Sequence, residues 1–203
     1  MPAPLPDPHS EAVLSRAVPP PDRTHSYGPD PAQVYDVRLP HSPSSGPVIH
    51  RVTVLLVHGG FWRAADDRTH AGAAAQALAG AGFHVAVGEY RRSGMPGGGV
   101  PGTLEDVTAL VAAVTHDPRL PRRLVLVGHS AGGHLVAWAA NHAWAARSVG
   151  VLALGGCLDL AATDRLGLGA NAARDFLGGG PEEAPAAWTL ADPVTSLPPR
   201  VPV

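Results

Sequence analysis

The stretch from Leu124 to Trp138, LVLVGHSAGGHLVAW, most constrains how this 203-residue chain can fold. Four apolar residues run into a glycine, Ser130 stands two places later, and small and apolar residues follow. Such an apolar run ending at glycine is typical of a buried strand, and the segment after the serine fits an amphipathic helix. We therefore expect a strand, a sharp turn and a helix in immediate succession.

The turn carries the pattern G-x-S-x-G at Gly128, Ser130 and Gly132. In a nucleophile elbow the serine occupies a strained turn, so the residues two before and two after it must be small. A glycine-rich chain also produces this pattern by chance, so the flanking strand and helix carry the interpretation. We predict Ser130 as a nucleophile, with the Ala131 N–H at the positive end of the helix donating to a developing oxyanion.

A second motif, His58 to Trp62 (HGGFW), follows the apolar run from Val52 to Val57. Hydrolases with this elbow take their remaining oxyanion donors from an H-G-G loop after a strand. The predicted donors are the backbone N–H groups of Gly60 and Phe61. Alone, the motif fits an ordinary turn equally well, and the elbow decides between the two interpretations. The aromatic pair Phe61 and Trp62 fits either a wall of the site or core packing.

Strand and helix patterns alternate along the chain, which predicts an α/β fold with a mostly parallel sheet flanked by helices. The expected strands are 33–39, 48–57, 83–90, 123–127 and 149–154, and the expected helices are 69–81, 103–116 and 131–144. Thr103 and Asp106 have the spacing of a capping box at the second helix. Residues 1–30 are rich in proline and predict a poorly ordered extension, which leaves 31–203 as the folded domain.

Taken together, these motifs resemble the α/β-hydrolase superfamily and, within it, the arylformamidase (kynurenine formamidase) and carboxylesterase-like branch. The matching segments are HGGFW at His58, EYR at Glu89, GHSAGGHL at Gly128, GCLDL at Gly156 and YGPDPAQVYDVRLP at Tyr27. The resemblance implies cleavage of a small carboxylic ester or aryl formamide through an acyl-enzyme on Ser130, with no metal or organic cofactor.

The resemblance also implies a late acid and a late histidine, and neither is evident. After Ser130 the only histidines are His134 and His142, on the helix that begins at the elbow and leads away from the hydroxyl. The resemblance therefore predicts a domain that is incomplete at its C-terminal side, because SLPPRVPV resembles the approach to a seventh strand. Asp159 is the candidate acid, although a structural role fits it better, and Asp192 fits a turn or cap.

A rival hypothesis follows from the absent base: the chain is a non-catalytic remnant, or a fragment that needs a completing chain. An open apolar sheet edge would then expose the protein to self-association as a homo-oligomer. An esterase activity of the 203-residue product would decide against this alternative.

Composition limits the partners. A net charge of −2 argues against a nucleic-acid-binding or membrane-seeking surface, and we expect a small-molecule ester or amide substrate. The opening residues lack a basic and apolar leader, and the single cysteine, Cys157, excludes an internal disulfide; both favour a cytoplasmic protein. The eleven histidines lack metal-ligand spacing, so no metal site is expected.

Overall fold

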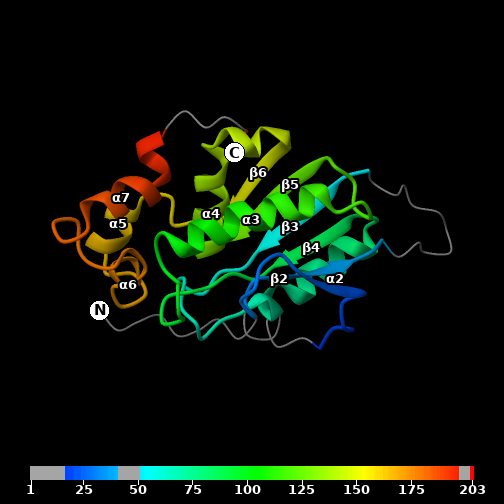
Figure 1. Ribbon diagram of the computed structural model, residues 1–203, viewed down its shortest axis with the longest axis horizontal. Coiled ribbons are helices and arrows are strands. Elements are labelled where there is room, and N and C mark those ends of the chain that lie inside the picture. Colours follow the sequence, from blue (N-terminus) through cyan, green and yellow to red (C-terminus); the bar gives the residue numbers. More distant parts are fainter. Residues whose placement is uncertain (1–16, 41–50, 197–201) are drawn as a thin grey trace.

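The computed structural model describes residues 17–40, 51–196 and 202–203, and their strands form one mixed sheet in the order β1-β2-β4-β3-β5-β6 (Figure 1). The strands are β1 (Arg23–Ser26), β2 (Val34–Arg38), β3 (Thr53–Val57), β4 (His84–Gly88), β5 (Leu124–His129) and β6 (Ser148–Leu154). β2 pairs antiparallel with β1 and β4, and the strands β4, β3, β5 and β6 are parallel to one another. The predicted α/β class with a mostly parallel sheet is confirmed.

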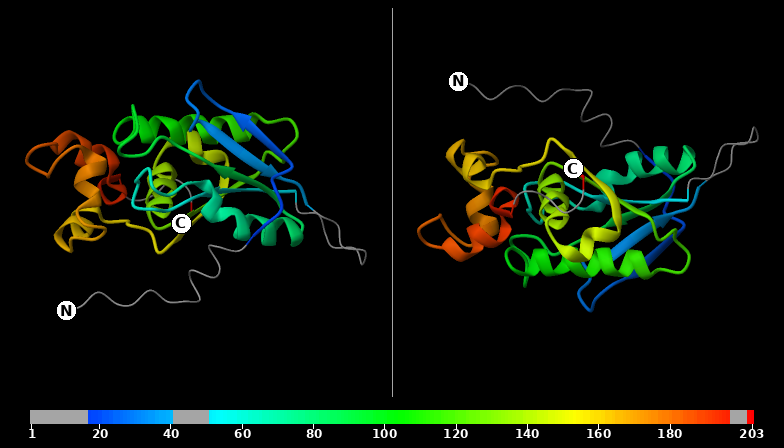
Figure 2. Two further views of the ribbon diagram at one scale, coloured as in Figure 1. Left: turned by 90° about the horizontal axis from the view of Figure 1, so that it is seen from below. Right: turned by 90° about the horizontal axis from the view of Figure 1, so that it is seen from above.

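Helices cover both faces of this sheet (Figure 2). The longer helices are α2 (Gly72–Gly80), preceded by the short η1 (Arg68–Ala71), α3 (Gly102–His116) and α4 (Ala131–Ala140). After β6, the short helices α5 (Leu160–Arg165), α6 (Ala172–Leu177) and α7 (Pro185–Ala191) gather at one end of the sheet (Figure 1). We call residues 160–191 the cap. Two single-turn helices, η2 (Ala143–Arg147) and η3 (Pro193–Ser196), follow α4 and α7.

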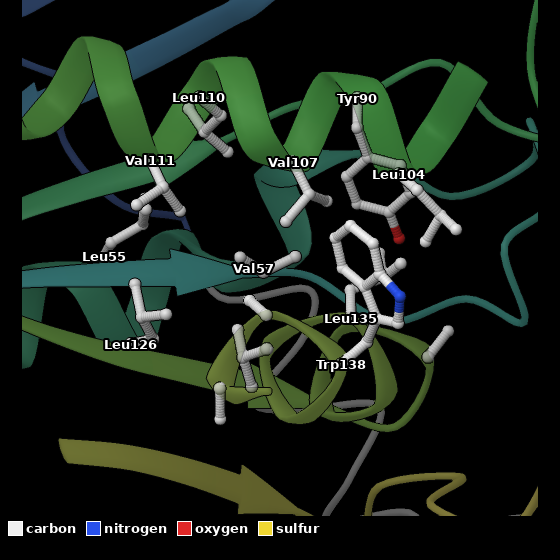
Figure 3. Packing of buried hydrophobic residues seen from close by; sticks show 14 of the residues in the cluster. Leu55, Val57, Tyr90, Leu104, Val107, Leu110, Val111, Leu126, Leu135 and Trp138 are labelled. Carbon is white, nitrogen blue, oxygen red and sulfur yellow. The ribbon is translucent and has the colours of Figure 1, made fainter. Parts of the chain in front are cut away.

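The larger core lies between the sheet and helices α3 and α4 (Figure 3). Leu55 of β3 and Leu126 of β5 are fully buried there against Leu110 of α3 and Leu135 of α4. Every residue of β3 is buried, as expected for a central parallel strand covered on both faces. This packing fixes the carboxyl ends of β3 and β5, from which the two predicted motif loops leave.

The opposite face is covered only in part. Helix α2 packs over β3 and β4 in a second, smaller core. On β5, buried Leu126 alternates with half-buried Val125 and Val127, and on β6 Leu152 and Leu154 are exposed. A cavity of about 220 Å³ opens between α2 and these strands. The surface around this cavity is apolar, because β5 and β6 carry the valine and leucine residues that are typical of strands covered by helices on both faces.

Three details differ from the sequence predictions. Strand β1 lies within the segment predicted as an extension, and Arg23 pairs with Val37 in the sheet, so the domain includes these residues; residues 1–16 lie outside the described part. The helix predicted for 131–144 ends at Ala140, and a separate turn follows. The predicted strand at 48–57 is described only from Arg51 on, and its observed part begins at Thr53.

The predicted capping box at Thr103 is wrong. The cap position of α3 is Pro101, and the Thr103 hydroxyl donates to the Arg91 carbonyl at 2.6 Å. Asp106 is fully buried and binds the Arg91 guanidinium at 2.6 Å. A tertiary ion pair therefore takes the carboxylate that the sequence pattern assigned to the helix terminus.

Candidate active site

Ser130 lies on the turn between β5 and α4, with φ 53° and ψ −117°. A positive φ is uncommon for a residue with a side chain and persists only where the surrounding structure enforces it. The Ser130 N–H donates to the Leu154 carbonyl at 2.9 Å, which ties the turn to the end of β6. The strained strand-to-helix turn predicted from the sequence is present.

The glycines of the motif are required by close backbone approach. A Cβ atom at Gly128 would lie 2.1 Å from the Gly132 carbonyl oxygen, and one at Gly132 would lie 2.1 Å from the Val57 carbonyl oxygen. Both distances are far below any van der Waals contact, and the obstructing atoms are backbone atoms that cannot turn aside. The turn can therefore form only with glycine at these two positions.

The loop after β3 lies directly against the turn. A Cβ atom at Gly59 would come within 3.1 Å of the Ser130 Cβ and 2.9 Å of the His129 carbonyl oxygen. In the described part of the chain, the N–H groups of Gly60 and Phe61 donate to no protein acceptor. Ala131 is the first residue of α4, where helical N–H groups lack an acceptor within the helix. Gly59, which directly precedes the predicted donors Gly60 and Phe61, therefore lies against the turn from which Ala131 begins α4.

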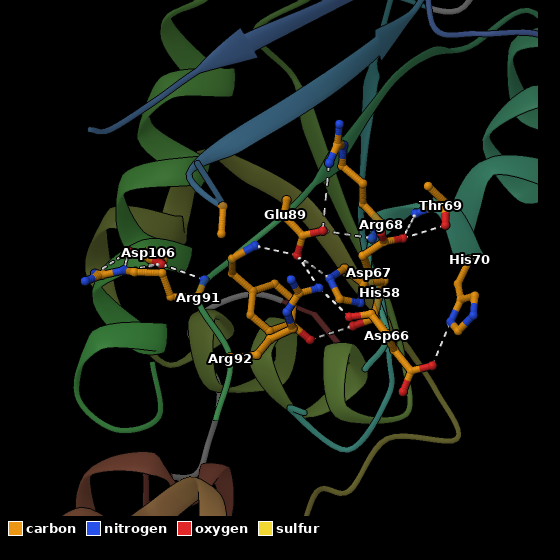
Figure 4. Close-up of polar contacts among 12 residues, drawn as sticks. His58, Asp66, Asp67, Arg68, Thr69, His70, Glu89, Arg91, Arg92 and Asp106 are labelled. Carbon is orange, nitrogen blue, oxygen red and sulfur yellow. Dashed lines mark hydrogen bonds and ion pairs between the residues drawn. The ribbon is translucent and has the colours of Figure 1, made fainter. Parts of the chain in front are cut away.

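A buried charge cluster holds this loop in place (Figure 4). Glu89 accepts hydrogen bonds from His58 Nε2 at 2.8 Å and from the Arg68 and Tyr90 N–H groups, and its carboxylate pairs with Arg92 at 2.9 Å. The Tyr90 hydroxyl donates to the His58 carbonyl at 3.0 Å. Both the side chain and the backbone of the first loop residue are thereby fixed.

The electrostatics of this cluster favour an ionised Glu89. Burial acts to raise the pKa of the carboxyl, but the hydrogen bond and charge of His58 and the two N–H donors outweigh it, so the pKa lies below its ordinary value. A buried carboxylate with several donors and a guanidinium partner is stable as an anion. EYR is thus the segment that anchors the HGG loop, a role that the sequence analysis did not assign.

The Cys157 thiol lies near the hydroxyls of Ser130 and Thr163. Burial raises the pKa of the thiol, and these two hydroxyls offset the shift only in part. The half-buried cysteine was predicted as a small filler; its contact with Ser130 was missed because nothing in the local sequence fixes the path of the chain after β6.

The His134 ring is bound to groups other than Ser130, and the residue meets Ser130 through its backbone N–H, which donates to the Ser130 carbonyl at 3.1 Å. It is fully buried, accepts from the Trp62 indole N–H at 3.2 Å and donates from Nε2 to the Ala191 carbonyl at 2.8 Å. Burial lowers its pKa to about 4, so the ring is neutral. His142 stacks on Trp144 with ring centroids 5.5 Å apart. As predicted from the sequence, the rings of both histidines have partners other than the Ser130 hydroxyl.

The two acids considered in the sequence, Asp159 and Asp192, lie near the start of α5. Asp159 is its N-cap and accepts from the Ala162 N–H at 2.7 Å, and it is exposed. Asp192 is buried and accepts from the Val194 N–H at 3.1 Å. Burial raises the pKa of Asp192, and the N–H groups of Val194, Leu160 and Ala161 offset this only in part. Both carboxylates therefore have structural partners at a helix terminus.

The described residues contain neither a metal-binding cluster nor a membrane-spanning helix. No group of three histidine, cysteine or acidic side chains is arranged there to hold a metal ion. No helix in those ranges combines the length and the apolar character needed to cross a membrane.

The comparisons with known proteins decide the family. Residues 35–202 match the BD-FAE family. The chain belongs to this family. The protein named "Putative acetyl-hydrolase LipR" from Mycobacterium tuberculosis is 34% identical over 102 residues. Among solved structures, a "putative thioesterase" from Silicibacter sp. TM1040 superposes with a TM-score of 0.65 at 25% identity over 88% of this chain. A truncated form of a carbohydrate esterase from gut microbiota superposes with a TM-score of 0.69 at 20% identity over 87% of this chain.

These similarities confirm the α/β-hydrolase fold but do not distinguish the arylformamidase branch from other branches. The similarity covers 50% of this chain and 30% of the acetyl-hydrolase, and the superposition covers 64% of the thioesterase structure and 73% of the carbohydrate esterase. The chain thus spans less than two thirds of the first two.

Proposed function

We propose that this chain is a serine hydrolase that cleaves a small carboxylic ester through an acyl-enzyme on Ser130. The observation that carries the proposal is the strained turn at Ser130 packed against the Gly59 loop, with unpaired N–H groups around it. The acetyl-hydrolase, thioesterase and carbohydrate esterase names among its relatives and structural neighbours support an ester as the substrate. An aryl formamide is the alternative substrate, because the sequence also resembles the arylformamidases.

In the proposed reaction the Ser130 oxygen attacks the ester carbonyl and its proton passes to a base. The carbonyl oxygen becomes an anion that the N–H groups of Gly60, Phe61 and Ala131 stabilise, and the alcohol then leaves with a proton. Water attacks the acyl-enzyme in the reverse sense and releases the acid. Asp159 stays a candidate acid, in competition with its capping role.

The Cys157 contact favours one alternative, in which the chain binds an ester without turning it over or needs a completing chain. In the described structure a thiol lies beside the Ser130 hydroxyl, whereas a working triad would place an imidazole there. Loss of a base typically costs several orders of magnitude in rate while oxyanion stabilisation survives. Slow turnover alone would therefore not separate the two.

The decisive experiment is covalent labelling of Ser130 by an alkyl fluorophosphonate, located by mass spectrometry, together with hydrolysis of p-nitrophenyl acetate and of an aryl formamide. Ser130→Ala is the control, and it should abolish both labelling and turnover. Turnover that survives in Ser130→Ala contradicts the acyl-enzyme. Labelling without turnover supports the binding alternative.

A further inference from the structure

Three consecutive residues of the HGG loop each contact the cap. They are Phe61, Trp62 and Arg63, and their partners lie 107 to 114 positions later in the chain, at Gly169, Phe176, Ala170 and Asp175. Phe61 and Trp62 both have left-handed backbone angles, with φ 50° and 57°. Side-chain-bearing residues adopt this conformation only where packing enforces it. The cap provides packing on both of them.

The first contact is between Phe61 and Gly169. A Cβ atom at Gly169 would lie 2.4 to 2.7 Å from three carbons of the Phe61 ring. Gly169 also has φ +60°, which a residue with a side chain adopts at a cost. The ring therefore rests directly on the backbone of the cap, and any side chain at position 169 would displace it.

The second contact is a stack of Trp62 on Phe176 of α6, with ring centroids 4.9 Å apart and an angle of 14° between the planes. Both rings are buried. The indole N–H donates to His134, whose other nitrogen donates to the Ala191 carbonyl at the end of α7. Trp62 is thus connected to both α6 and α7.

The third contact is polar. Arg63 donates from Nη2 to the Ala170 carbonyl at 3.0 Å and to the Asp175 carboxylate at 2.8 Å. The pair is partly exposed, with 38% of the arginine and 54% of the aspartate side chain accessible. Its energy alone is small, but it joins the cap to the same loop as the two aromatic contacts.

From these contacts we infer that the cap positions the oxyanion donors, with Gly169 and Asp175 as positioning residues. Displacement of the Phe61 ring turns the peptide whose N–H is a proposed donor, so the cap and the oxyanion hole must be assembled together. An oxyanion donor acts on the transition state, and its misplacement lowers kcat more than it raises KM. The catalytic part of this inference rests on the proposed function; the mechanical part does not.

The test uses the full chain and the variants Gly169→Ala and Asp175→Asn. Arg174→Gln is the matched control, because Arg174 is the neighbour of Asp175 and its partly exposed ion pair with Asp164 lies wholly within the cap. The first readout is hydrogen–deuterium exchange of the peptide covering residues 58–66. We expect faster exchange there in Gly169→Ala and, to a smaller extent, in Asp175→Asn, with the control matching the wild type.

The second readout is hydrolysis of p-nitrophenyl acetate. Outright loss of one oxyanion donor costs about 100- to 1,000-fold in kcat, so the displaced loop of Gly169→Ala should cost about 10- to 100-fold with KM nearly constant. The milder Asp175→Asn keeps the test decisive where Gly169→Ala fails to fold. Unchanged exchange at 58–66 in a folded variant overturns the inference. Changed exchange in a chain that never labels at Ser130 supports the positioning and contradicts the proposed function instead.

Discussion

The Cys157 thiol lies beside the Ser130 hydroxyl, although α4 and β6 separate the two residues along the chain. Ser130 reaches this position because its N–H is bound to the last carbonyl of β6. A group attached to Cys157 would therefore occupy the space that an ester must enter.

Methylthiolation of Cys157 should block phosphonylation of Ser130. Because burial raises the pKa of this thiol, the fraction of reactive thiolate is small at neutral pH. The modification rate should therefore keep rising at pH values above those at which the rate of an exposed cysteine levels off. Mass spectrometry of the doubly treated protein checks the prediction. In Cys157→Ala the thiol reagent should leave Ser130 labelling unchanged; full labelling of the methylthiolated wild type would show that the two side chains are not neighbours.

Asp159→Asn separates the capping role from the catalytic one. Asparagine is as good an N-cap as aspartate, so the free energy of unfolding should change by less than about 0.5 kcal/mol. Hydrolysis and Ser130 labelling should then stay within about twofold of the wild type. A loss of about 100-fold or more at unchanged stability would assign the triad acid to Asp159. Urea denaturation and p-nitrophenyl acetate kinetics measure the two quantities.

How far the site could be predicted depends on sequence distance. The elbow and the HGG loop are local sequence patterns. The prediction that small residues must flank Ser130 is confirmed, because a Cβ atom at Gly128 or Gly132 would clash with backbone atoms. The partners of the loop were not predictable in the same way. Glu89 and Phe176 reach the loop through tertiary packing, and single-sequence patterns carry no signal for pairs so far apart.

The fold was predicted best where the sequence has an uninterrupted run of apolar residues. β3 and β5 lie in the sheet where the apolar runs placed them, and the strand at β1 was missed because RTHS is short and polar. That strand is held by pairing to β2 rather than by burial, since three of its four residues are exposed. The short cap helices were missed for a related reason, because one or two turns are too few to establish a period.

Acid stability should depend on Asp117. Burial acts to raise the pKa of this carboxyl, but hydrogen bonds from Arg119 and Tyr35 reverse the shift and lower the pKa from 3.8 to about 2. A depressed folded-state pKa stabilises the fold above the unfolded value, so about 2 kcal/mol should be lost as the pH falls from about 4 to about 2. In Asp117→Asn this part of the pH dependence should vanish. Equal slopes of stability against pH in both proteins would contradict it.

The open apolar face of β6 should make the protein associate with itself. Leu152 and Leu154 are 51% and 46% exposed, and Leu154 lines the cavity at α2. The Val151 N–H donates to the Pro202 carbonyl, so the β6 edge has at least one backbone partner. We expect the face more than the edge to drive association. Leu152→Lys should shift sedimentation velocity toward monomer, because a charge cannot be buried unpaired.

Leu190→Lys is the control for that experiment. Leu190 of α7 is 49% exposed, close to the value for Leu152, but it lies in the cap and not on the sheet. The same charge is added in both variants, so a general gain in repulsion affects them equally. Dissociation in Leu152→Lys alone assigns the interface to the β6 face. Dissociation in both variants contradicts this assignment, because only loss of the interface's own contacts should dissociate the oligomer. A wild type that stays monomeric across the concentration range contradicts self-association itself, because the fraction of oligomer rises with protein concentration.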